Sequence, residues 1–114
     1  MKLAPDAQAD AWLRDLEYGP EDFDWDKGNS TKNAKHGVED DEIESIFSGE
    51  FAFAGRIVEP DRGEWRGLAL GRSERGRHLA LVFTRRADKL RPISCRPMRQ
   101  EERRLYEEKV QRYS

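Results

Sequence analysis

The chain has 114 residues, a net charge of −2 and a single cysteine, and 39% of its residues are charged against 36% hydrophobic. This length fits one small domain, and no apolar run approaches the roughly 20 residues of a membrane span. The N-terminus lacks the apolar segment of a secretory signal and one cysteine suits a reducing compartment, so we expect a cytoplasmic protein with no membrane contact.

The N-terminal half predicts helices around one short strand. Apolar residues recur at i, i+3, i+4 and i+7 over residues 6–17, which is the pattern of an amphipathic helix. Residues 23–26 alternate apolar and acidic side chains and predict a strand. A short helix through His36 is expected next, with Gly37 as its C-terminal cap. Residues 41–48 carry the apolar face of a further helix.

After residue 50 the apolar period shortens to two residues, which predicts strands at residues 51–58, 64–72, 78–86 and 89–96. The connections are short enough for antiparallel neighbours. Residues 79–83 are apolar on both faces and predict the central strand. Pro92 has no N–H, so the last strand should lie at an edge or be interrupted there. A charged helix is expected over residues 100–112.

These elements predict an α+β fold: a mostly antiparallel sheet of about four to five strands packed with helices. The chain has no P-loop, nucleotide-binding glycine fingerprint, zinc spacing or Ser/His/Asp triad. We therefore expect neither a metal nor a cofactor.

Charge is unevenly distributed along the chain. Residues 1–50 hold 5 Lys/Arg and 14 Asp/Glu, a net of −9, whereas residues 51–114 hold 16 Lys/Arg and 9 Asp/Glu, a net of +7. Fourteen of these 16 cations are arginine, whose planar fork matches phosphate or carboxylate. The basic half favours a polyanion or an acidic protein partner, although arginine stems also cover small sheets.

The Lys35-His36-Gly37 motif has two interpretations. A cation near a helix C-terminus stabilises the helix by about 0.3–1 kcal/mol, and the spacing alone favours this structural role. In the functional interpretation His36 is an acid or base, since histidine titrates near neutral pH, and Lys35 contacts phosphate.

A second cluster comes from the last strand, with Arg91, Ser94 and Arg96, and from the final helix, with Glu102, Arg103 and Tyr106. It is either a salt-bridge network between helix and sheet or an arginine cage for a phosphodiester. RNA cleavage without a metal needs a base for the 2′-hydroxyl, cations for the phosphate and an acid for the leaving oxygen. Arginine is a poor base, so the candidates are His36, Tyr106 and a carboxylate such as Glu64 or Glu102.

Several short motifs follow one another along the chain. In order they are Phe23-Asp24-Trp25-Asp26, Asn33, Lys35-His36-Gly37-Val38, Phe47, Glu64, Arg66, Leu79-Ala80-Leu81-Val82-Phe83-Thr84, Arg91-Pro92-Ile93-Ser94-Cys95-Arg96, Glu102-Arg103 and Tyr106-Glu107. In order and spacing this set resembles the BrnT family, the toxins of a bacterial type II toxin–antitoxin system. The resemblance covers about residues 23–108, so residues 23–114 would be a BrnT-like toxin domain.

The resemblance implies a RelE-like fold and a metal-independent endoribonuclease that cleaves RNA and inhibits translation. It also implies a BrnA-like ribbon-helix-helix antitoxin, through which alone the toxin would reach operator DNA. By matching position, the catalytic residues would be His36, Arg91, Arg96, Glu102, Arg103 and Tyr106, and the RNA-binding residues Lys35, Arg66, Arg85 and Arg99. Arg91 and Arg96 would clamp phosphate, Arg103 would stabilise the transition state, and His36 or Glu102 would transfer protons.

The chain departs from the family pattern in three places. Residues 1–22 are an acidic, helical N-terminal extension ahead of the usual start of the family. Pro92 replaces an aliphatic residue, and Arg99 replaces a helix-capping threonine. The extension is an acidic lid, an antitoxin contact or a poorly ordered tail, and the last two are favoured. The departures keep an alternative open: a catalytically silent RelE-like module that binds a partner protein or RNA. In a third interpretation the protein is a structural subunit whose arginines only solvate the sheet.

Overall fold

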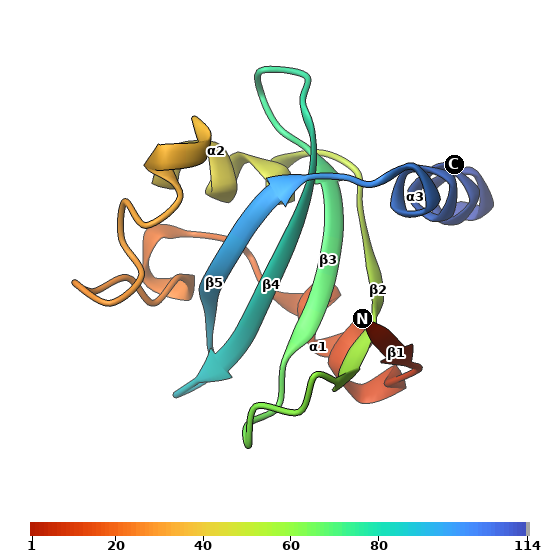
Figure 1. The fold of residues 1–114 in the computed structure, drawn as a ribbon, viewed down its shortest axis with the longest axis horizontal. Helices are drawn as coiled ribbons and strands as arrows, with labels where there is room; N and C mark the ends of the chain where they lie inside the picture. Colours follow the sequence, from red (N-terminus) through yellow and green to blue (C-terminus); the bar gives the residue numbers. More distant parts are fainter. Residues whose placement is uncertain (114) are drawn as a thin grey trace.

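The computed structural model describes residues 1–113, with side chains through residue 111, as one antiparallel sheet with helices on both faces (Figure 1). The strands follow one another in the sheet in chain order. They are β1 (Lys2–Ala4), β2 (Phe51–Glu59), β3 (Gly67–Arg72), β4 (His78–Arg86) and β5 (Lys89–Pro97). This confirms the α+β class, and the arrangement is compatible with a RelE-like toxin fold.

The helices divide between the two faces of the sheet. They are α1 (Ala7–Asp15), the 3-10 turns η1 (Pro20–Asp22) and η2 (Ala34–His36), α2 (Asp40–Ser45), the 3-10 turn η3 (Ile46–Ser48) and α3 (Gln100–Tyr113). In Figure 1, α1 and α2 lie behind the sheet, whereas α3 lies to the right over β2 and β3. Within residues 1–113, no helix is long and apolar enough to cross a membrane.

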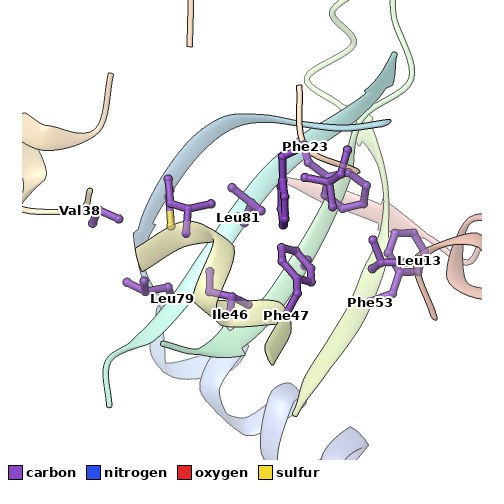
Figure 2. Close-up of a cluster of buried hydrophobic side chains, with 13 residues drawn as sticks. Leu13, Phe23, Val38, Ile46, Phe47, Phe53, Leu79 and Leu81 are labelled. Atoms are coloured by element: carbon purple, nitrogen blue, oxygen red, sulfur yellow. The ribbon is translucent and has the colours of Figure 1, made fainter. Parts of the chain in front are cut away.

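The main hydrophobic core fills the space between the sheet and the helices behind it. Leu79, Leu81 and Phe83 of β4 are fully buried in it, together with Ile43 and Ile46 from α2 and η3 (Figure 2). A smaller cluster under α3 contains the alternate residues of the strands, because successive side chains of a strand point to opposite faces. The predicted central strand, β4, is an interior strand, but β3 holds the middle position.

The N-terminal extension shares both the sheet and the main core. β1 pairs antiparallel with β2, with Leu3 opposite Ile57. Asp6 caps α1, since its Oδ1 accepts a hydrogen bond from the Ala9 N–H at 3.1 Å, and Leu13 of α1 is fully buried. The interpretation of residues 1–22 as a poorly ordered tail is therefore wrong. The boundary at residue 22 stays a prediction.

The expected strand at residues 23–26 is wrong: this segment makes only a single parallel bridge, between Phe23 and Leu90. The expected helix before His36 is also mostly wrong, because residues 27–33 form turns and only η2 is helical. Asp40 holds these turns, accepting bonds from the Ser30 hydroxyl at 2.5 Å and the Thr31 N–H at 2.9 Å.

Residues 24–33 nevertheless run along the outer edge of β5 and pair with its backbone. The Asp24 N–H donates to the Leu90 carbonyl at 2.9 Å. The Asn29 side-chain amide donates to the Pro92 carbonyl at 2.9 Å, and Asn33 Oδ1 accepts from the Cys95 N–H at 3.1 Å. Both asparagines are buried, so polar groups at this edge are satisfied by one loop N–H and two asparagine side chains rather than by a paired strand.

The other elements lie close to where the sequence places them. β2, β4, β5 and α3 match their predicted ranges to within one residue, whereas β3 begins at Gly67 rather than at residue 64. β5 is an edge strand whose register shifts beside Pro92, as the missing N–H of proline predicts. Gly37 has φ 75° and caps η2, also as predicted.

Candidate functional site

A basic cleft lies where β4 begins and α3 starts. The Met98 N–H donates to the His78 carbonyl at 2.9 Å, which fixes the β5–α3 connection against the first residue of β4. Figure 1 shows this connection crossing in front of the strands before it enters α3. The cleft has a volume of about 500 Å³, and the residues that line it include His78, Arg77, Arg99 and Arg103.

Glu102 organises the start of α3. Its carboxylate accepts two hydrogen bonds from the Arg96 guanidinium, at 2.7 and 2.9 Å, and one from the Arg99 N–H at 2.8 Å. Burial alone would raise the pKa of Glu102, but these bonds outweigh it and the pKa is lowered. The bond from the Arg99 N–H to Glu102 is one of the two hydrogen bonds of a capping box. The other bond needs a side-chain acceptor at residue 99, which arginine lacks.

Tyr106 anchors α3 to the sheet. Its hydroxyl donates to the Glu50 carbonyl at 3.0 Å, and the residue is 7% exposed. Burial and the Glu50 carboxylate raise its pKa. The ring also meets the imidazole of His78 edge-on, with centroids 5.7 Å apart and planes at 78°, so Tyr106 forms one wall beside that histidine.

His78 is the residue that the sequence analysis did not select. It is half-buried and opposite Arg72 in the pairing of β3 with β4. The pKa of His78 is lowered, mainly by burial and then by the positive charges of Arg103 and Arg72. The negative charge of Glu107 raises it by a smaller amount. The imidazole is therefore neutral at pH 7. Its partners come from another strand and a docked helix, so no local signal in the sequence marks it.

The Lys35-His36-Gly37 motif adjoins Arg77, one of the residues that line the cleft. The Arg77 guanidinium donates to the Gly37 carbonyl at 2.5 Å and, through Nε, to Glu42 at 2.8 Å. Lys35 and His36 themselves are exposed on η2. Arg77 therefore connects this motif to the border of the cleft, and its guanidinium is also bound to the buried carboxylate of Glu42.

A comparison with known protein families identifies the family of this chain. A family model described as the ribonuclease toxin, BrnT, of type II toxin–antitoxin systems matches residues 25–102. The chain belongs to the BrnT family. It is thus a ribonuclease toxin of a type II system, with RNA as its substrate and an antitoxin as its partner. Comparison with curated proteins gives no match.

In this BrnT chain, part of the predicted site lies at the opposite end of the sheet. Arg91 is opposite Thr84 in β4, six residues from His78, which corresponds to about 20 Å along a strand. Two hydrogen bonds of 3.0 Å hold its guanidinium on Asp26, and they raise the pKa of Arg91 and lower that of Asp26. Only 12% of the Arg91 side chain is exposed.

Arg66 and Arg85 also lie at that opposite end of the BrnT fold. Arg66 donates through Nε to Glu64 at 3.0 Å, and the Arg85 guanidinium lies 4.8 Å from the centre of the Trp12 ring. The structure therefore brings Arg99, Arg103 and Tyr106 to His78 and links Arg96 and Glu102 to this group through the Arg99 N–H. Lys35 and His36 precede Gly37, which is bound to Arg77, and Arg66, Arg85 and Arg91 lie apart at the other end of the sheet.

Proposed function

We propose that this BrnT chain is a metal-independent endoribonuclease that cleaves RNA in the cleft between β4 and α3 and so inhibits translation. The observation that carries the proposal is the composition of that cleft. Arg77, Arg99 and Arg103 line it, beside an imidazole that is neutral at pH 7. Guanidinium groups bind phosphate oxygens through paired N–H donors and stabilise the charge that grows on them in the transition state.

The arginines differ in how readily they can take a phosphate. Arg103 is paired with Glu107 at 3.0 Å, but both side chains are about half exposed, and such surface pairs contribute little to stability. A phosphate can therefore displace Glu107. Arg96 is held by the buried Glu102, and Arg91 by Asp26, so their predicted role as phosphate clamps requires the loss of these ion pairs.

The proposed partner is a BrnA-type ribbon-helix-helix antitoxin that covers the basic cleft in the cytoplasm and connects the toxin to operator DNA. Family membership supports an antitoxin, and the net +7 of residues 51–114 supports an acidic or polyanionic ligand for this half of the molecule. An antitoxin that covers the cleft should compete with RNA for binding.

The test is incubation of the purified chain, free of antitoxin, with single-stranded and structured RNA in EDTA. The wild type should give fragments with 2′,3′-cyclic phosphate ends. An Arg99→Ala/Arg103→Ala variant should lose activity by at least about 100-fold, as expected for removing donors to a developing oxyanion. Arg62→Ala is the matched control, because Arg62 is an exposed arginine in the loop before β3.

Intact RNA in every lane, from folded protein, would refute the proposal and favour the second candidate, a catalytically silent module that binds RNA or a partner protein. The internal ion pairs of Arg91 and Arg96 are the observation that favours this candidate. Such a module would still bind RNA with an affinity that falls steeply with salt, because phosphate contacts release counterions.

A further inference from the structure

We propose that His78 is the general base that takes the proton of the attacking 2′-hydroxyl. The inference rests on the proposed ribonuclease function and adds the residue that the family resemblance leaves undecided. It follows from two sets of observations. The other candidate bases that the sequence suggests are engaged or distant, whereas His78 is both free to accept a proton and close to arginines that can bind phosphate.

The carboxylates and the tyrosine are already engaged. Glu102 accepts three hydrogen bonds from Arg96 and Arg99, which stabilise its ionised form and make it a weak base. The Tyr106 hydroxyl donates to the Glu50 carbonyl, and burial favours its neutral form. Glu64 precedes β3 at the opposite end of the sheet, where it is paired with Arg66.

The other histidine, His36, is exposed on η2 and is not among the residues that line the cleft, whereas its neighbour Gly37 is bound to Arg77. His78, in contrast, lines the cleft itself. With only two histidines in the chain, the choice of imidazole is between these two positions, and only His78 lies beside Arg99 and Arg103.

The surroundings of His78 suit proton transfer from a substrate that carries a phosphate. Arg72 faces it from β3, and Arg103, Glu107 and Tyr106 face it from α3. The two arginines favour the neutral imidazole, which is the form that accepts a proton. When a phosphodiester binds these arginines, its negative charge offsets theirs, so the pKa of His78 should rise in the complex and the base should become stronger.

The proposed step is an internal transesterification. The 2′ oxygen forms a bond to phosphorus while the bond from phosphorus to the 5′ oxygen breaks, and the electron pair of that bond goes to the departing oxygen. His78 takes the proton of the 2′-hydroxyl, and the departing oxygen takes a proton from solvent water. The products are a 2′,3′-cyclic phosphate and a 5′-hydroxyl, after which the imidazolium returns its proton to the solvent.

The experiment compares the pH dependence of cleavage in the wild type, His78→Gln and His36→Gln. A general base contributes about 10²–10⁴-fold to the rate, so His78→Gln should lose that much activity. It should also lose the acidic limb of the pH–rate profile, which is the fall in cleavage rate at low pH caused by protonation of the base. His36→Gln should keep this acidic limb. In the wild type, the limb in kcat should lie at higher pH than the limb in kcat/KM, because the former reports the complex. Added imidazole should restore part of the activity of His78→Ala.

A measurement on the wild type alone avoids any effect of substitution on folding. NMR titration of the His78 imidazole, with and without a 2′-deoxy dinucleotide that cannot be cleaved, should show a pKa below the ordinary histidine value that rises when the probe binds. An unchanged His78 pKa would overturn the inference. Cleavage by His78→Gln with the wild-type limb would overturn the inference alone, whereas a wild type that does not cleave RNA would overturn the proposed function and this inference with it.

Discussion

Leu13→Ala tests whether the N-terminal extension is a structural part of the domain. Leu13 lies on α1, outside the residues matched by the family model, yet it is fully buried in the main core (Figure 2). The substitution removes three carbons, worth about 0.8 kcal/mol each in lost burial, and leaves a cavity in a core made by α1, the sheet and η3. We expect a loss of about 3 kcal/mol in the free energy of unfolding.

For a domain of this size, that loss corresponds to a fall in Tm of roughly 12 °C. The assay is urea and thermal unfolding followed by circular dichroism, with Glu17→Ala as the control, because Glu17 is exposed just after α1 and its substitution should change stability by about 0.5 kcal/mol at most. A single transition is expected in every variant. A loss below about 1 kcal/mol, or a separate early transition that alone responds to Leu13→Ala, would refute the view that the extension and the sheet unfold together.

Two further predictions concern buried groups behind the sheet. Glu42 is 1% exposed and accepts bonds from Arg77 and Ser73, which lower its pKa, so Glu42→Gln should cost about 1–3 kcal/mol at pH 7. Because the pKa is lowered, this stabilisation is complete above the ordinary value of 4.5 and is lost as the pH falls through the folded-state value. Urea unfolding at pH 7 and pH 3 should therefore show that the difference in free energy of unfolding between wild type and variant becomes smaller in acid. A difference that does not change with pH would contradict the ion pair. Burial raises the pKa of Cys95 to about 12, so its thiol should resist a disulfide reagent at pH 8 in the native protein and react on unfolding; rapid stoichiometric reaction of folded protein would contradict that burial.

The elements that the sequence predicts well are those with a sustained period. From Phe51 onward the ends of β2, β4 and β5 are predicted to within one residue, whereas β3 begins three residues later than predicted. Pro92 identifies the edge strand by its missing N–H. β1 has only three residues, too few to show a period. Residues 24–33 lie along β5 but do not form a strand. They are held there by the buried side chains of Asn29 and Asn33, which bind the β5 backbone more than 60 residues away in sequence.

The candidate site was predictable in part for the same reason. Glu102, Arg103 and Tyr106 are close in sequence, so helical spacing brings them together. The link from Arg96 to Glu102 spans the turn between β5 and α3 and requires only that the two elements are consecutive. His78 was missed because its neighbours depend on the pairing of β3 with β4 and on the docking of α3, neither of which a local pattern contains.

The way in which residues 24–33 line β5 limits how a partner protein can recognise this toxin. Many binding proteins attach by adding a strand to an open sheet, but here the backbone of β5 is already occupied by Asp24, Asn29 and Asn33. At the other side the sheet ends in the three residues of β1, which offer little length for such an addition. We therefore expect an antitoxin to recognise side chains on the faces of this protein, where the arginines lie, so the residues proposed to hold RNA are also the ones available for inhibition.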